Sequence, residues 1–167
     1  MYMDEGLDTG DILLQRTINI RSDETGGSLH DRLAQIAPDA LLDALRLLGE
    51  GNAPRIPQDN TRVTYAPKLK REDGRIDWSE PADAIERKIR AFNPWPGAFM
   101  AIDGRNLKIF SGSVVDLSGE PGKILRSEKE LVIAAGKGAL SLGEVQLEGK
   151  RPMSASEFVR GHRNWSS

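Results

Sequence analysis

The sequence contains no cysteine, which excludes disulfide bonds, thiolate nucleophiles and zinc sites with cysteine ligands. No run approaches the ~20 consecutive apolar residues of a transmembrane helix. Aromatic residues make up only 5% of the chain, too few for a surface on which several nucleic-acid bases stack. The 38% of hydrophobic residues in a chain of 167 is nevertheless enough for a packed core. Since absent cysteine is consistent with a reducing cytosol, we expect a cytoplasmic protein with no membrane partner.

Charge is divided unevenly along the chain. Residues 1–50 carry four Lys or Arg against ten Asp or Glu, whereas residues 51–167 carry nineteen against fifteen. The split indicates two units with different surroundings, the second of which tolerates or attracts an anion. Its positive balance is too small to predict nucleic-acid binding by itself.

The first fifty residues predict one strand and a helical region. β-branched and apolar residues at 12–20 predict the strand. Apolar side chains then recur every three or four residues, which predicts a helix that Thr25 or Ser28 caps and that ends at Gly49. Pro38 lacks an N–H and is expected to kink or divide this helix. One strand and a helix pair are too little to enclose a core, so we expect that the sheet this strand joins belongs to a larger N-terminal part outside this chain.

The middle of the chain predicts a linker followed by a second helix. Residues 54–72 contain three prolines and no hydrophobic periodicity, which is typical of an extended linker. Ser79 is expected to begin a helix that continues to about Ala91, with Pro81 in its first turn.

From residue 98 onward the hydrophobic period changes to two. Short β runs separated by Gly, Asp-Gly or charged turns predict a small, closed or nearly closed antiparallel barrel. One hairpin turn is expected at 136–138. Ser154 and Glu157 have the spacing of a capping box, which predicts a short helix near the end of the chain.

An acidic, glycine-containing cluster stands at the start of the chain. Within eight residues lie Asp4, Glu5, Asp8 and Asp11, with Gly6 and Gly10 among them. The spacing does not fit a calcium loop, which needs a bidentate acid at its twelfth position, so we expect no metal site. Taken by themselves, these residues are most simply interpreted as a turn in front of a strand.

The same cluster, MDEGLDTGDIL, resembles the end of the catalytic domain of the methionyl-tRNA formyltransferase family. Four further blocks follow in the matching order and spacing: VTYAPKLKREDGRIDWS, IRAFNPWPGAF, PGKIL and GKRPMSASEF. The resemblance implies an α/β remnant at 1–53, the end of a Rossmann-like formyltransferase domain. It also implies a linker at 54–72 and an OB-like antiparallel β-barrel with flanking helices at 73–167.

The resemblance further implies transfer of a formyl group from 10-formyltetrahydrofolate to the amino group of methionine on initiator tRNA, by a full-length enzyme that is monomeric. The active site of the family combines Asn, His and Asp. The Asp corresponds to Asp8, whereas the upstream N-x-H-x-S-L-L-P motif has no match in this sequence. We therefore expect this chain alone to be inactive. Folate-loop positions implied by the resemblance are Asp4, Glu5, Gly6, Leu7 and Gly10.

The resemblance also places tRNA along the linker, where Lys68, Lys70 and Arg71 suit phosphate contacts. Without the resemblance, a solvated linker face would be the simpler interpretation. Cations of second rank for tRNA are Arg87, Lys88, Arg90, Lys123, Arg126, Lys150 and Arg151. The aromatic residues Phe92, Trp95 and Phe99 are expected to pack where the second helix meets the barrel.

Two other functions stay open. A related enzyme on the same scaffold would formylate an amino-sugar nucleotide or hydrolyse formylfolate. A non-catalytic nucleic-acid-binding module would instead require residues 1–50 to fold by themselves. An unpaired edge of the predicted strand at 12–20 would favour self-association of this chain.

Overall fold

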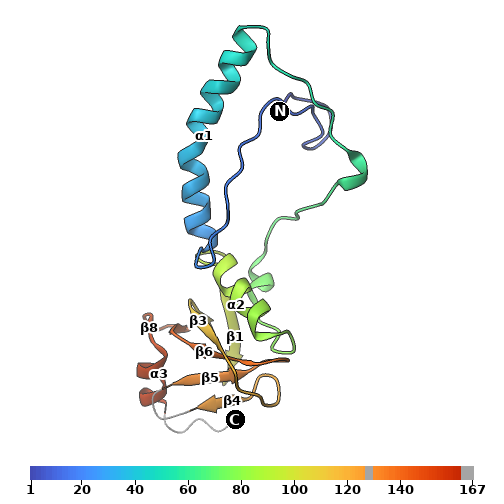
Figure 1. The fold of residues 1–167 in the computed structure, drawn as a ribbon. Helices are drawn as coiled ribbons and strands as arrows, with labels where there is room; N and C mark the ends of the chain where they lie inside the picture. Colours follow the sequence, from blue (N-terminus) through green and yellow to red (C-terminus); the bar gives the residue numbers. More distant parts are fainter. Residues whose placement is uncertain (127–129, 163–167) are drawn as a thin grey trace. The chain divides into compact units, whose positions relative to one another are not determined.

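The computed structural model describes residues 1–126 and 130–162, which divide into two compact units (Figure 1). The N-terminal unit consists of Met1–Ser22 and Ser28–Lys68, and the C-terminal unit of Asp23–Gly27 and Leu69–Ser167. The predicted domain limits at residues 53 and 72 stay a prediction. Among the described residues, no helix has the length and apolar character needed to cross a membrane.

The N-terminal unit is built around one long helix, α1 (Gly26–Gly49), whose first two residues belong to the other unit. Its end is closed by two backbone hydrogen bonds, from Asn52 N to Leu47 O at 2.9 Å and from Gly51 N to Leu48 O at 3.2 Å. This pattern is a Schellman motif and confirms the predicted end. Pro38 lies inside α1 and does not divide it, so of the two expected effects only the kink stays a prediction. The proline is exposed at this position, so water can reach the carbonyl group that it leaves without a helical partner.

The strand predicted at 12–20 is wrong for this chain. Ile12 forms an isolated antiparallel bridge with Ile56, through N–H···O bonds of 2.8 and 3.1 Å, and the described backbone from 13 to 20 has no strand assignment. A strand requires a neighbour along its length, and the residues that the structure describes supply only this short contact. The predicted self-association through a strand edge at 12–20 therefore has no support in the structure. Further along, the short 3₁₀ helix η1 (Asn60–Arg62) follows Asp59, which caps it.

The C-terminal unit contains two antiparallel sheets, each with four strands. The order in the first sheet is β1 (Ala98–Ile102), β2 (Arg105–Ile109), β7 (Glu144–Leu147) and β8 (Met153–Ser154). The order in the second is β3 (Gly112–Val115), β6 (Ala139–Leu142), β5 (Leu131–Ala134) and β4 (Ile124–Arg126). Among the described residues the strand pairs do not link the two sheets into a closed ring. The antiparallel strands are confirmed, whereas the OB-like barrel is not.

Short turns determine how the strands follow one another. A two-residue turn, Asp103-Gly104, joins β1 to β2 with φ values of 45° and 72°, as the twist of a hairpin requires. The predicted hairpin at 136–138 is confirmed, since Ala134 of β5 pairs with Ala139 of β6. Between β6 and β7 the chain passes from one sheet to the other at Gly143.

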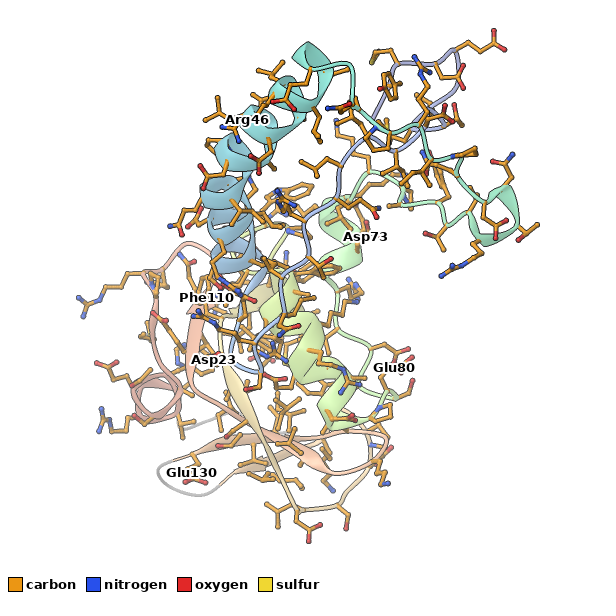
Figure 2. All side chains as sticks on the ribbon, turned by 45° about the horizontal axis from the view of Figure 1, so that its top comes forward. Asp23, Arg46, Asp73, Glu80, Phe110 and Glu130 are labelled. Atoms are coloured by element: carbon orange, nitrogen blue, oxygen red, sulfur yellow. The ribbon has the colours of Figure 1, made fainter. Side chains whose placement is uncertain are left out.

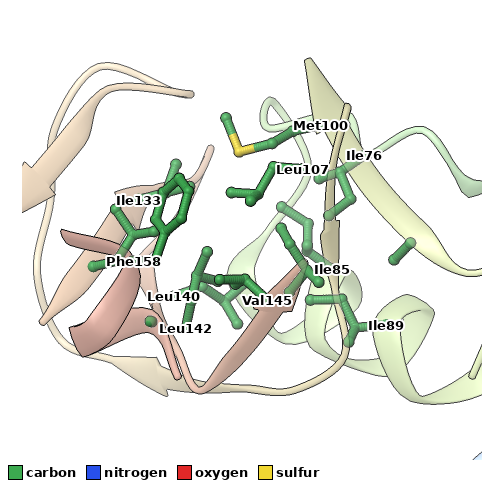
Figure 3. Packing of buried hydrophobic residues seen from close by; sticks show 14 of the residues in the cluster. Ile76, Ile85, Ile89, Met100, Leu107, Ile133, Leu140, Leu142, Val145 and Phe158 are labelled. Atoms are coloured by element: carbon green, nitrogen blue, oxygen red, sulfur yellow. The ribbon is translucent and has the colours of Figure 1, made fainter. Parts of the chain in front are cut away.

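The core of the C-terminal unit lies between the two sheets and two helices (Figure 3). Helix α2 (Ala82–Ala91) contributes Ile85 and Ile89, which are 2% and 1% exposed. The sheets contribute Leu107, Ile133, Leu140, Val145 and others, and helix α3 (Ala155–Gly161) contributes Phe158. In β1, β2 and β7 buried side chains alternate with more exposed ones, as the period-two pattern predicts, whereas all four residues of β5 are buried.

Two helix starts show how local side chains decide an element boundary. Helix α2 begins at Ala82 and not at the predicted Ser79. Ser79 instead donates its backbone N–H and its hydroxyl to Asp77 Oδ1, at 2.9 and 2.7 Å, which forms a turn ahead of the helix. Helix α3 has the predicted capping box, with Ser154 Oγ accepting from Glu157 N at 3.2 Å and Glu157 Oε2 accepting from Ser154 N at 2.9 Å.

Candidate functional site

The acidic turn (residues 4–11) is an irregular loop held closed by the backbone. Tyr2 N donates to Asp11 O at 2.9 Å, which brings the two ends of the turn together. Gly10 is buried beneath this contact, and a Cβ there would overlap the carbonyl oxygen of Tyr2. A glycine at position 10 is therefore required for the close approach of the two segments.

Asp8 lies at the exposed tip of the acidic turn. Its φ is +56°, a left-handed conformation that Asp tolerates better than most residues. Its carboxylate has no hydrogen bond or ion pair with the described residues, while its backbone carbonyl is bonded to Gln58. The backbone of Asp8 is thus held while its charged group stays free to meet a ligand or another catalytic group. Its catalytic role stays a prediction.

Two other carboxylates of the turn, those of Asp4 and Asp11, have local contacts. Asp4 accepts from the backbone N–H of Glu5 at 2.7 Å and from the hydroxyl of Thr9 at 3.3 Å. Asp11 lies 3.6 Å from a guanidinium nitrogen of Arg55. The side chain of Leu7 is 91% exposed, so apolar surface is also available beside the acids. The folate contacts expected for Asp4, Glu5, Gly6, Leu7 and Gly10 stay predictions.

A clamp from residues 53–58 holds the acidic turn, and the sequence analysis did not predict it. Gln58 Nε2 donates to Asp8 O at 2.7 Å and to Gly10 O at 2.8 Å. The guanidinium carbon of Arg55 lies 3.8 Å from the ring centre of Tyr2. These contacts join positions about fifty residues apart in a stretch without periodicity, so no local pattern could have predicted them.

The linker cations are exposed, as phosphate contacts would need: Lys68, Lys70 and Arg71. The last two lie at the 3₁₀ helix η2 (Arg71–Gly74), where the N–H of Lys70 donates to Asp73 Oδ2 at 2.7 Å. Asp73 is labelled in Figure 2. This capping contact fixes the backbone that carries both cations. Their contacts with tRNA stay predictions.

The three cations of α2 are already engaged within the C-terminal unit. Arg87 pairs with Asp83 at 2.8 Å, and Lys88 Nζ donates to Arg75 O at 2.7 Å. Arg90 is only 22% exposed, binds Glu86, and donates to Glu24 O at 2.9 Å. The hydrogen bond with Glu86 raises the pKa of Arg90 above its ordinary range. We regard these three as the weakest of the predicted tRNA contacts.

The remaining predicted cations lie around the strands of the C-terminal unit. Lys123, Lys150 and Arg151 are exposed, and none of them has an ion pair in the part of the chain that the structure describes. The backbone of Arg126 ends β4, but its side chain lies outside the described residues. Trp95 is 57% exposed, so the predicted junction packing is wrong for this residue. Phe92 and Phe99 are half-buried and do not belong to the core cluster of the C-terminal unit, so their packing at the junction stays a prediction.

Two regions of the chain match families of known proteins. Residues 68–163 match the family described as formyl transferase, C-terminal domain, and residues 1–45 match the formyl transferase family. The chain is 46% identical to a methionyl-tRNA formyltransferase of Syntrophus aciditrophicus, over 98% of this chain and 53% of that protein. It is 43% identical to the methionyl-tRNA formyltransferase of Geobacter sulfurreducens, over 98% of this chain and 52% of that protein.

The fold is also found among solved structures. HypX from Aquifex aeolicus in complex with tetrahydrofolic acid matches with a TM-score of 0.67 and 21% identity, over 98% of this chain and 31% of that chain. At this identity the likeness is one of fold alone. The chain spans about half the length of the curated relatives it matches. Because the family match at 68–163 covers more than half of the 167 residues, the chain belongs to the formyl transferase family.

Proposed function

We propose that this chain forms the C-terminal half of a methionyl-tRNA formyltransferase, which works in the cytoplasm on initiator tRNA. The observation that carries the proposal is the 46% identity to such an enzyme across 98% of this chain. The acidic turn would supply one catalytic carboxylate, and the C-terminal unit, with an OB-like arrangement of strands, would bind the tRNA. The formyl donor would be 10-formyltetrahydrofolate, a substrate and not a resident cofactor.

The proposed chemistry explains the need for a free carboxylate. The amino nitrogen of methionine attacks the formyl carbon, the carbonyl oxygen gains negative charge, and the attacking nitrogen must lose a proton. The bond between the formyl carbon and N10 of the folate then breaks, and N10 takes up a proton as tetrahydrofolate leaves. A carboxylate beside an imidazole favours the cationic form of the ring and helps to accept that proton. An amide and an imidazolium near the oxygen stabilise the developing charge. Asp8 has the exposed, unpaired carboxylate that this role requires.

The proposed tRNA contact uses charge along the linker. Lys68, Lys70 and Arg71 are exposed within four residues of one another. Flexible cations at such spacing neutralise successive phosphates, and each contact makes binding dependent on salt. Such contacts position an RNA without reading its sequence.

A chimera tests the catalytic part of the proposal. The first half of the Syntrophus aciditrophicus relative would be joined to residues 1–167, and formylation of methionyl-tRNA would be measured. We expect activity in the chimera and none in the 167 residues alone. Asp8→Asn should lower kcat by about 10²–10⁴-fold, the range for a group that moves a proton. The matched control Asp39→Asn removes an exposed carboxylate of α1 in the same unit and should change kcat by less than about threefold.

The result that contradicts the proposal is equally concrete. An Asp8→Asn chimera with unchanged kcat would remove Asp8 from the mechanism. A chimera that formylates an amino-sugar nucleotide and not tRNA would favour the related enzyme. Should the chimera not fold, tRNA binding by the 167 residues still tests the partner: Lys70→Met should weaken binding at low salt, and unchanged binding would count against the linker contact.

A further inference from the structure

A hollow of about 220 Å³ with polar and apolar lining lies on the outer face of the first sheet of the C-terminal unit. Strands β1, β2 and β7 line it with Phe99, Asn106, Lys108 and Gln146, Glu148 lines it directly after β7, and Arg71 of η2 lies at its edge. Its volume is below the ~300–1,000 Å³ of typical small-molecule pockets. The hollow therefore has room for one group of a larger ligand, or for part of a small ligand.

The register of the strands gives the hollow two rows of side chains. Phe99 pairs with Lys108, and Lys108 with Gln146, so these three form one row across the sheet. Asn106 and Glu148 form the next row, because Glu148 N donates to Asn106 O at 2.9 Å. Residues between them along the strands, such as Leu107, point to the core.

Two close backbone approaches hold the cations at this hollow. A Cβ at Gly97 would collide with the aliphatic chain of Lys108, so the lysine stem lies across the backbone of residue 97. A Cβ at Gly74 would overlap Gly97 O, so η2, with Arg71 at its start, packs directly on the start of β1. Ile76 N donates to Phe99 O at 2.9 Å and fixes η2 beside the same strand. The two cations therefore stand on rigid backbone.

The charged side chains of the hollow are separated by sign, with the cations at one end and a carboxylate at the other. Neither Arg71 nor Lys108 forms an ion pair with any described residue. Glu148 stands two residues further along the strands, roughly 7 Å away at ~3.4 Å per residue, and accepts from Asn106 N at 3.1 Å. Gln146 Nε2 donates to Lys150 O at 2.7 Å, which leaves its oxygen as an acceptor. One end thus suits an anion and the other suits hydrogen-bond donors, with an aromatic ring between.

We propose that this hollow binds one nucleotide unit. The phosphate would lie at Arg71 and Lys108, the base against Phe99, and a base amino group or ribose hydroxyl against Glu148. Base–aromatic contact tolerates any base, because every base has a π face. A bare phosphate would use the cations but would meet the carboxylate of Glu148. The proposal rests on the proposed tRNA binding for its natural ligand and adds to it a subsite in which Arg71, one of the linker cations, acts together with Lys108 and Phe99.

The same chemistry is present in a nucleotide of RNA and in a free nucleotide, so the test uses both. Binding of initiator tRNA to the full 167-residue chain would be measured by fluorescence anisotropy over a series of salt concentrations. Binding of AMP and of inorganic phosphate would be followed by NMR at the backbone amides of β1, β2 and β7.

Two variants remove the proposed contacts without changing side-chain volume greatly. Phe99→Leu removes the ring and should weaken tRNA binding about fivefold, at the low end of base–aromatic contacts. Lys108→Met keeps the aliphatic stem over Gly97 and should weaken binding about threefold, with a salt slope smaller by about 0.7–0.9 for one lost phosphate contact. Arg105→Met is the matched control. Arg105 is an exposed cation of β2, but its position in the alternation of the strand is opposite to that of Lys108, and it does not line the hollow. This variant should leave both measurements unchanged.

Each possible result either supports or contradicts the proposed nucleotide site. NMR shifts with AMP but not with phosphate support the nucleotide site if they are lost in Phe99→Leu. A parallel loss of tRNA binding in the same variant identifies RNA as the source of the nucleotide. AMP shifts without tRNA binding support a free nucleotide and contradict the proposed tRNA partner. Equal shifts with AMP and inorganic phosphate would overturn the proposal. Normal tRNA binding by both variants, with a loss only in Lys70→Met, would also overturn it and leave the proposed function intact.

Discussion

The two units of this chain differ in how they bury apolar surface. In the C-terminal unit, α2, α3 and two sheets enclose one cluster in which Leu107, Leu140 and Phe158 are 0% exposed. In the N-terminal unit, α1 has no buried residue, and Leu42 and Leu45 are 60% and 55% exposed. An amphipathic helix gains most of its stability by packing an apolar face, and the described residues do not supply that packing for α1.

The unit with the well-packed core is therefore not the unit that carries the candidate catalytic carboxylate. The candidate catalytic carboxylate belongs to the N-terminal unit, where a few hydrogen bonds from Gln58 and Tyr2 hold the acidic turn. The candidate RNA surface of the C-terminal unit is built on strands with a closed core behind them. Parts of a protein with few buried contacts open most easily. We therefore expect substitutions in the two units to affect different measurements.

The largest effect should come from truncating a core leucine. Leu140→Ala removes a fully buried side chain of β6 and should lower the free energy of unfolding by about 3 kcal/mol, through lost burial and the cavity left behind. Leu42→Ala makes the same chemical change on α1 and should cost less than about 0.5 kcal/mol. Urea unfolding followed by circular dichroism would measure both. A comparable loss in Leu42→Ala would show that the apolar face of α1 is packed in solution.

A smaller, local effect is expected at the clamp on the acidic turn. Gln58→Ala removes two hydrogen bonds, worth about 1–2 kcal/mol together, so amide exchange of Tyr2 and Ile12 should become about 5- to 30-fold faster. Both amides donate to backbone carbonyls of the same unit. Gln15→Ala removes an exposed glutamine elsewhere in the N-terminal unit and is the control. If exchange is unchanged in Gln58→Ala, the clamp does not stabilise the turn.

Removal of a helix cap in the C-terminal unit should cost about as much free energy as removal of the Gln58 hydrogen bonds, or less. Ser154→Ala removes the side-chain acceptor at the start of α3 and should lower the free energy of unfolding by about 1 kcal/mol. Ser118→Ala, at an exposed position of the same unit, should have no measurable effect. Equal unfolding curves for the Ser154 variant and the parent would mean that α3 does not depend on its cap.

The sequence predicted the C-terminal unit better than the N-terminal unit, for a physical reason. Period-two patterns and turn residues are local signals, and they gave the strands, the hairpin at 136–138 and the capping box of Ser154. The strand at 12–20 failed because a strand depends on a partner that local pattern cannot supply. Trp95 was expected to pack and is exposed, since apolar character alone does not fix the direction of a side chain in a turn.

The candidate sites also differ in how much of each could be predicted from the sequence. The acidic turn was found from its residues and its family resemblance, because both lie in one short segment. Gln58 was not found, since its contact with Asp8 spans about fifty positions. The row formed by Phe99, Lys108 and Gln146 was not found either, because it exists only once the strand register is known.

The smallest predicted effect is a dependence on pH that distinguishes the two units. The backbone N–H of Ser154, and next its hydroxyl, donate to Glu157 and hold the pKa of that carboxyl below its ordinary value of 4.5. A lowered pKa in the folded state stabilises the fold above the ordinary value, and this contribution is lost as the pH falls through the folded-state pKa. The unfolding midpoint in urea should therefore decrease slightly from pH 6 to pH 3.

Glu157→Gln isolates this contribution, because glutamine still fits a capping box but does not titrate. The variant should show a weaker dependence of its unfolding midpoint on pH than the parent. Asp59 of the N-terminal unit also has a lowered pKa, from the hydroxyl and then the N–H of Thr61. Since no core depends on that turn, Asp59→Asn should leave the pH dependence of cooperative unfolding unchanged. If Asp59→Asn alters it as much as Glu157→Gln does, the two units unfold together, and the separation of stability from chemistry is incorrect.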